Sequence, residues 1–164
     1  MNPQLSLSTL YEQDYYLWLE QTAHLLRSGR FQNVDVENLI EEIEDMGRSQ
    51  KDALYSNLKV VLMHLLKWKY QQDLRSSSWR ASIREHRQRL KKAFKDSPSL
   101  KRYFTEIFDE CYSDARPLAA DETNLPLDTF PELCPFETDE VLNPDYLPDL
   151  EEDVQPSQQS QQDE

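Results

Sequence analysis

A run of carboxylates near residue 40 is the first feature of this sequence that suggests chemistry. The stretch 38-NLIEEIEDMG-47 places four acidic residues in five positions: Glu41, Glu42, Glu44 and Asp45. Carboxylate oxygens are the ligands that hard divalent cations prefer, and many metal-dependent phosphohydrolases hold magnesium with closely spaced acids. The stretch therefore raises the hypothesis of a divalent-metal site.

The helical positions of these acids favour a different interpretation. At about 100° per residue, the apolar residues share one arc, which we expect to be buried: Val36, Leu39, Ile40, Ile43 and Met46. Most of the acids share the opposite arc: Glu37, Glu41, Glu44 and Asp45. One exposed helix face does not converge enough oxygen ligands on a metal ion. We therefore predict a solvated or ion-paired face.

A metal-dependent enzyme remains the alternative. The spacing Glu41-Glu42-x-x-Asp45 is similar to the EExxE helix of all-α nucleotide pyrophosphatases, which place an ExxD pair on the next helix. Here the pair Glu106-x-x-Asp109 comes two helices later. A phosphohydrolase of this kind would use Glu41, Glu44, Asp45 and His64, with Mg or Mn as the metal because the donors are hard oxygens.

Positive charge is concentrated in the middle of the chain. Between Lys67 and Arg102 there are twelve Lys or Arg residues and three acids, whereas fourteen acids and no Lys or Arg follow Arg116. Four basic residues repeat at helical spacing and form a ladder: Arg80, Arg84, Arg87 and Lys91. We predict that this ladder either pairs with the acidic face or docks an anionic partner. A protein is favoured over nucleic acid, because the net charge is −13 and few aromatic residues accompany the arginines.

The remaining reactive side chains give weaker signals. His64 lies in the most apolar part of the chain, so a core histidine held by a hydrogen bond is favoured over a ligand or general base. Cys111 and Cys134 lack metal-ligand spacing and are expected to be free thiols. The sequence shows no recognisable general base for Cys111 or for the serines at 76–78. The chain contains only two glycines, too few for a phosphate-binding glycine loop.

Apolar residues recur at helical spacing through most of the chain, which predicts an all-α bundle of about five helices. We expect one helix to end near Gly29, a second from Asp35 to a break at Gly47, and a longer central helix carrying Leu54, Leu58, Val61, Leu65 and Trp68. A fourth helix is expected to end at Ser97-Pro98, and a fifth to end by Pro117.

The last third of the sequence has a different composition. Prolines recur from Pro117 to Pro148, so we expect residues 117–147 to form a strap across the bundle, with one short helix near Thr138 to Leu142. Residues 148–164 have the acidic, Gln- and Ser-rich composition of a disordered tail. The predicted organisation is thus an extension at 1–9, one bundle domain at 10–147 and the tail.

Location is predicted from what the sequence lacks. The first residues have neither the basic nor the apolar part of a signal peptide, and the apolar run near 60-VVLMHLL-66 is too short to span a bilayer. We therefore expect a cytoplasmic, acidic protein without contact with a membrane.

Several short motifs, taken in order, resemble one bacterial family. They are 14-DYYLWL-19, 39-LIEEIEDMG-47, 64-HLLKW-68, 79-WRASI-83, 98-PSL-100, 119-AADETNLP-126 and 130-FPELCPF-136. The ordered set is similar to the family called domain of unknown function 29, best known from cyanobacteria, and covers roughly residues 10–147. One departure is 71-QQD-73, where a Gln-Pro pair is expected. The resemblance implies a helical fold and brings no activity with it.

The sequence as a whole favours a binding protein over an enzyme. No complete set of catalytic residues is recognisable, whereas charge is sharply segregated along the chain. We therefore predict a non-catalytic helical module, without a cofactor, that binds a protein partner through Arg80, Arg84, Arg87 and Lys91. The metal-dependent phosphohydrolase stays open as the second hypothesis.

Overall fold

The computed structural model describes residues 6–149, and every regular element within them is helical. The all-α prediction is therefore confirmed. The chain divides into two compact units, with the boundary between Gln50 and Lys51 inside α3, and each unit is described by itself. Residues 1–5 lie outside the described part, as do residues 150–164 of the tail predicted at 148–164.

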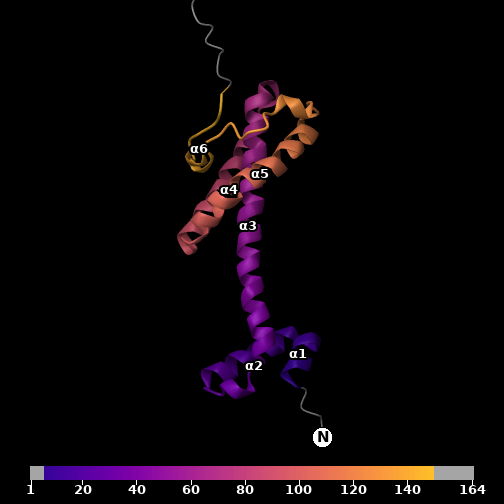
Figure 1. Ribbon diagram of the computed structural model, residues 1–164, viewed down its shortest axis with the longest axis vertical. Coiled ribbons are helices and arrows are strands. Elements are labelled where there is room, and N and C mark those ends of the chain that lie inside the picture. Colours follow the sequence, from indigo (N-terminus) through magenta and orange to yellow (C-terminus); the bar gives the residue numbers. More distant parts are fainter. Residues whose placement is uncertain (1–5, 150–164) are drawn as a thin grey trace, which may run out of the picture. The chain divides into compact units, whose positions relative to one another are not determined.

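The first unit contains α1 (Leu7–Gln13), α2 (Tyr15–Arg27), the short 3-10 helix η1 (Phe31–Asn33) and the start of α3 (Val36–Tyr70) (Figure 1). The sequence predicted a single helix ending near Gly29, which is wrong, because two helices, α1 and α2, occupy this segment. Asp14 leaves helical geometry, with φ −149° and ψ 81°, and its side chain accepts a hydrogen bond from the backbone N–H of Leu17. An aspartate placed in this way caps a new helix and so separates α1 from α2.

The end of α2 follows the predicted position. Gly29 has a φ of +70°, in the left-handed region that glycine adopts at low cost. The N–H of Gly29 donates to the carbonyl of Leu26, and the N–H of Arg30 donates to that of Leu25. These two bonds form a Schellman motif, which satisfies carbonyls at the helix end.

Helix α3 continues through Gly47 without a break, contrary to the prediction. One glycine inside a helix costs only about 1 kcal/mol relative to alanine, which the helical residues on both sides offset. A second correction concerns the arc expected in the core. Leu39 is half-buried, but the other four members are 51–66% exposed: Val36, Ile40, Ile43 and Met46.

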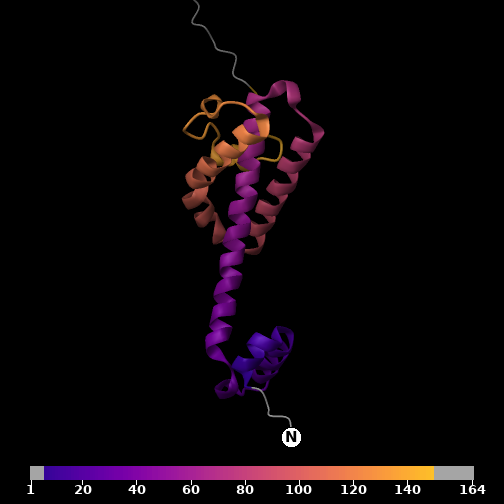
Figure 2. The ribbon, with the colours of Figure 1, turned by 90° about the vertical axis from the view of Figure 1, so that its right-hand side faces the viewer.

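The second unit packs α4 (Ser77–Asp96) and α5 (Leu100–Thr123) against the C-terminal part of α3, with the 3-10 turn η2 (Gln72–Leu74) between α3 and α4 (Figures 1 and 2). The four aliphatic residues predicted for the core of α3 are buried: Leu54, Leu58, Val61 and Leu65. Trp68, predicted with them, is half-buried. Each fully buried leucine contributes about 1.5–3 kcal/mol relative to an exposed one.

Helix α5 runs past Pro117, where the sequence predicted its end. A proline inside a helix removes one hydrogen bond, here the one to the carbonyl of Ser113, and both residues lie on the exposed side. Beyond the proline, Ala119, Ala120 and Thr123 are buried. Their packing explains why the helix continues to Asn124, a left-handed C-cap with a φ of 56°.

The strap is therefore shorter than predicted and comprises residues 124–149. It contains the 3-10 turn η3 (Leu127–Thr129) and the helix α6 (Thr138–Leu142), whose bounds agree with the predicted short helix. Glu137 and Glu140 form a capping box at the start of α6. Phe130, Phe136, Val141 and Pro148 are buried, so the strap completes the core of the second unit.

Within residues 6–149, no helix is both long enough and apolar enough to cross a membrane.

Candidate functional site

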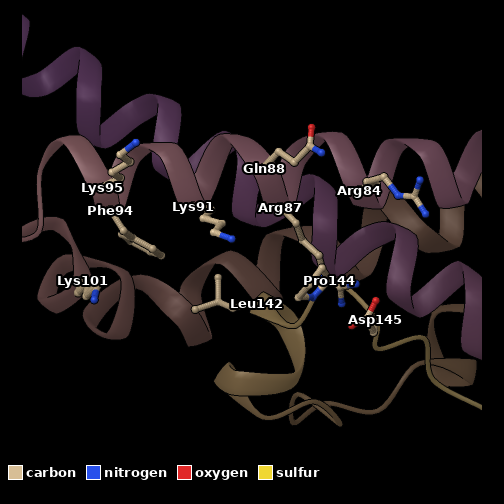
Figure 3. Close-up of a pocket in the computed structure, with 10 residues that line it drawn as sticks. All are labelled: Arg84, Arg87, Gln88, Lys91, Phe94, Lys95, Lys101, Leu142, Pro144 and Asp145. Atoms are coloured by element: carbon tan, nitrogen blue, oxygen red, sulfur yellow. The ribbon is translucent and has the colours of Figure 1, made fainter.

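A basic groove lies between α4, the first turn of α5 and the strap, and has a volume of about 820 Å³. Helical spacing places Arg84, Arg87, Lys91 and Lys95 along its α4 side. Lys101 at the start of α5 adds a fifth cation. In Figure 3, the side chains of Arg87, Lys91 and Phe94 project from α4 toward Leu142 of the strap.

The charge of the groove is strongly unbalanced. Its lining contains those five cations and one acid, Asp145. Within residues 6–149, the exposed side chains of Arg84, Lys91, Lys95 and Lys101 have no hydrogen-bond or ion-pair partner. Phe94, Leu142 and Pro144 supply apolar lining between the charges. The groove therefore combines unpaired positive charge with apolar surface.

Arg87 differs from the other cations because it is buried and its donors are used. Its guanidinium donates to three backbone carbonyls of the strap: that of Val141 at 2.7 Å, that of Tyr146 at 2.8 Å and that of Glu140 at 3.1 Å. Only 4% of the residue is exposed, and this burial lowers the pKa of Arg87 to about 10. It remains charged at neutral pH and holds the strap on α4.

The structure brings three members of the predicted ladder to this groove: Arg84, Arg87 and Lys91. Arg80, the fourth, is exposed on α4 and is not part of the lining. The sequence did not indicate that Arg87 would be buried, because its three acceptors lie more than fifty residues away in the chain. Lys95 and Lys101 were not predicted as site residues, although the same spacing extends from Lys91 to Lys95.

The closely spaced acids near residue 40 lie in the first unit. Glu41, Glu44 and Asp45 are exposed, and Arg48, on the next helical turn, makes ion pairs with Glu44 and Asp45. Exposed pairs at this spacing contribute only about 0.3–0.5 kcal/mol each, but they offset repulsion among the acids. The predicted pairing of this face with the arginine ladder stays a prediction.

Unlike the other acids of this stretch, Glu42 contacts the neighbouring helices of the first unit. Its two carboxylate oxygens accept hydrogen bonds of 2.6 Å from the hydroxyls of Tyr11 and Tyr15. These bonds lower the pKa of Glu42, the bond from Tyr11 having the largest effect. In the same way, the carboxylate raises the pKa of Tyr11 to about 12. Glu42 therefore attaches α3 to α1 and α2.

In the described part of the chain, no three His, Cys, Asp or Glu side chains are grouped in a way that could hold a metal ion. The alternative set of Glu41, Glu44, Asp45 and His64 draws its acids from the first unit and its histidine from the second. A Mg or Mn site formed by these four residues therefore remains a hypothesis that rests on the sequence alone.

His64 is half-buried on α3, and its Nδ1 lies 3.0 Å from the carbonyl oxygen of Val60. Because a carbonyl can only accept, Nδ1 carries the proton in the neutral ring. Burial is the main reason that the pKa of His64 is lowered. The hydrogen bond with the Val60 carbonyl and the charge of Glu122 oppose this shift, whereas Lys67 and His86 add to it. The geometry agrees with the predicted core histidine.

A pH dependence follows from this environment. Folded His64 resists protonation, whereas unfolded His64 accepts a proton near pH 6.5, so we expect the free energy of unfolding to fall as the pH drops below about 6.5. His64→Gln is expected to reduce this loss without abolishing it, because the pKa of His86 is lowered too. Urea denaturation between pH 7.5 and 5.5 measures the slope. The exposed variant His24→Gln is the control, and an equal slope in all three proteins would contradict the assignment.

One charged cluster, formed by Lys67, Glu122 and Trp79, was not predicted from the sequence. Lys67 is buried, its Nζ lies 2.5 Å from Oε2 of Glu122, and it stands 4.4 Å from the ring centroid of Trp79. Glu122 falls within the predicted strap at 117–147, but it lies in the last turn of α5. The sequence does contain one indication of this cluster, because Lys67 is a charged residue within an otherwise apolar stretch of α3 and so requires a partner.

Comparison with known proteins identifies a family. No curated protein and no solved structure is significantly similar to the chain. A family model described as "Domain of unknown function DUF29" matches residues 10–147, which include both units, the groove and nearly the whole strap. With most of its length matched, the chain belongs to the DUF29 family.

Proposed function

We propose that this protein is a non-catalytic binding module and that its basic groove receives an acidic segment of a partner protein. The observation that carries the proposal is the lining of the groove, where four exposed cations without partners among the described residues surround Phe94 and Leu142. A volume of about 820 Å³ lies within the roughly 300–1,000 Å³ common for ligand sites.

The chemistry of the lining favours a peptide with carboxylates and at least one apolar side chain. Cations on two helices are placed to meet acids along such a segment, and the apolar lining offers contact for a side chain between them. Nucleic acid fits less well, because Phe94 is the single aromatic residue of the lining and binding of single strands relies on several stacking rings.

Charge reversal in the groove tests the proposal. Arg84→Glu combined with Lys91→Glu is expected to weaken binding of a fluorescent poly-glutamate probe, and of any co-purifying protein, about 10- to 100-fold, since each lost contact is worth about 1 kcal/mol and repulsion adds to it. Fluorescence anisotropy at two salt concentrations gives the affinities. Arg87 is left intact because it holds the strap.

A matched control changes the same charge outside the groove. Arg89→Glu with Lys92→Glu alters two exposed residues of α4 that do not line the groove, and it changes the net charge equally. We expect its affinity to remain within a few-fold of that of the wild type. Equal weakening in both double variants would mean that only the overall charge matters, and it would overturn the groove as the site. Tighter binding of a single-stranded oligonucleotide than of poly-glutamate would overturn a protein partner.

A further inference from the structure

Helix α3 exposes an apolar stripe in the first unit. Val36, Ile40, Ile43 and Met46 are 52%, 51%, 60% and 66% exposed, respectively. Their spacings of four, three and three residues place them on one face of the helix, as in a buried helix–helix contact. Four large apolar side chains gathered on one face are uncommon on the surface of a monomer and indicate an interface.

The other helices of the unit contact a different face of α3. Tyr11 and Tyr15 bind Glu42, which at about 100° per residue lies roughly 100° or more away from Ile40 and Ile43 around the helix. Among the described residues of this unit, the buried apolar side chains are Leu10 and Trp18, which is a small core. The first unit would therefore gain much of its apolar burial from a partner on the stripe.

The order of charges beside the stripe indicates what that partner is. Along one flank the acids come first, at Glu37, Glu41 and Glu44, and two bases follow. Arg48 also makes exposed ion pairs with acids of its own helix, and the ammonium of Lys51 lies 4.9 Å from the ring centroid of Tyr103. In a parallel pair this flank would face the opposite flank of the second copy, which carries Asp35, Glu42 and Ser49 and no base. In an antiparallel pair the flank faces its own counterpart, so the acids of each copy lie against the bases of the other. The flank is thus complementary to itself in the antiparallel direction.

We propose that residues 36–51 of α3 pair antiparallel with the same residues of a second copy of this chain. Ile43 lies near the two-fold axis and Ile40 packs against the second copy's Met46. Glu41 faces the second copy's Arg48, and Glu37 faces its Lys51, because both charge pairs have their midpoint close to residue 44, within two residues of Ile43. An interface of this kind is isologous and closes as a dimer. The proposal is independent of the basic groove, which lies in the second unit.

The oligomeric state of the full chain is the first test. Sedimentation equilibrium is expected to show a dimer, and Ile43→Asp is expected to raise its dissociation constant at least about 100-fold, since both copies lose a buried side chain and gain a charge. Tyr16→Asp, at a residue 70% exposed on α2 of the same unit, is the matched control and is expected to leave the dimer intact. Circular dichroism checks that both variants remain folded.

Two further experiments test the antiparallel direction. Glu41→Arg and Arg48→Glu are each expected to weaken the dimer, and the double variant is expected to restore it. Under mild oxidation, Ile43→Cys is expected to form a disulfide-linked dimer, whereas Val36→Cys, far from the axis, is not. The wild type controls for Cys111 and Cys134, which are buried and half-buried.

The outcomes that overturn the proposal are distinct. A wild-type chain that stays monomeric at about 100 µM excludes a stable dimer. Efficient cross-linking of Val36→Cys, as well as Ile43→Cys, shows a parallel pairing. A double charge variant as weak as the single ones removes the antiparallel charge match. A monomeric chain that binds a different protein through Ile43 assigns the stripe to that protein.

Discussion

Arg87→Met is expected to lower the free energy of unfolding by about 3 kcal/mol or more and to loosen the strap. The substitution keeps an apolar side chain of similar length but removes the donors to the carbonyls of Glu140, Val141 and Tyr146. The bond to Val141 is buried and the other two are partly buried, so the carbonyl of Val141 in particular loses its charged donor without gaining water in its place. Urea denaturation measures the stability, and hydrogen exchange of the amides at 138–147 measures how firmly the strap is held.

Two matched variants make this expectation specific. Arg87→Lys retains the charge but lacks the planar guanidinium that reaches three carbonyls at once, so we expect only partial recovery. Arg84→Met changes an exposed arginine one turn earlier on α4, and it should alter stability by less than about 0.5 kcal/mol. If Arg87→Met matched Arg84→Met in both stability and exchange, Arg87 would not hold the strap.

The contrast between Arg84 and Arg87 also shows what sequence alone can indicate about the groove. Helical spacing correctly placed both arginines on α4, because the repeat of about 3.6 residues depends only on local geometry. Which of them is buried depends on three backbone carbonyls of the strap. Every residue has a backbone carbonyl, so the pattern of residue types cannot show which ones will accept hydrogen bonds from an arginine. The groove was visible as a run of positive charge, but its strap wall and its structural arginine were not.

The same distinction explains the successes and errors in the fold. The short helix α6 was found within its bounds, because prolines on both sides confine it and acids occupy its first turn. The central leucines of α3 were placed in the core because their spacing and hydrophobicity agree. Gly47 and Pro117 were read as helix ends. The packing of buried residues beyond Pro117 outweighs the local cost of that proline, whereas the neighbours of Gly47 are exposed and its cost is offset by the helical residues on both sides.

The stripe on α3 is the most informative error. Val36, Ile40, Ile43 and Met46 have the pattern of a core face, and the pattern does not say which molecule supplies the other side of that core. The same periodicity predicts burial within a chain and burial between two chains. Their exposure in the described structure is therefore the observation that turned an expected core into a proposed interface.

Phe130→Ala is expected to cost about 3–5 kcal/mol of stability. The side chain is fully buried, and its ring lies edge-on to that of Tyr70 with the centroids 5.5 Å apart. Its carbonyl accepts a hydrogen bond of 2.8 Å from Nε of Arg116. Leu133→Ala, three residues further along the strap, removes a side chain that is 84% exposed and should cost less than about 0.5 kcal/mol. Urea denaturation of both variants gives the comparison.

The effect of Phe130→Ala on amide exchange and on binding distinguishes two ways in which the strap can support the groove. Phe130 anchors the beginning of the strap, whereas the groove is lined by Leu142, Pro144 and Asp145, which Arg87 holds independently. If the strap is one cooperative piece, Phe130→Ala should speed amide exchange at 138–146 as well as near residue 130, and it should weaken binding of the acidic probe without any change of charge. If exchange rises only near residue 130 and affinity is kept, the Arg87 contacts alone maintain the groove. A Phe130→Ala protein as stable as Leu133→Ala would show instead that the strap contributes little to the core.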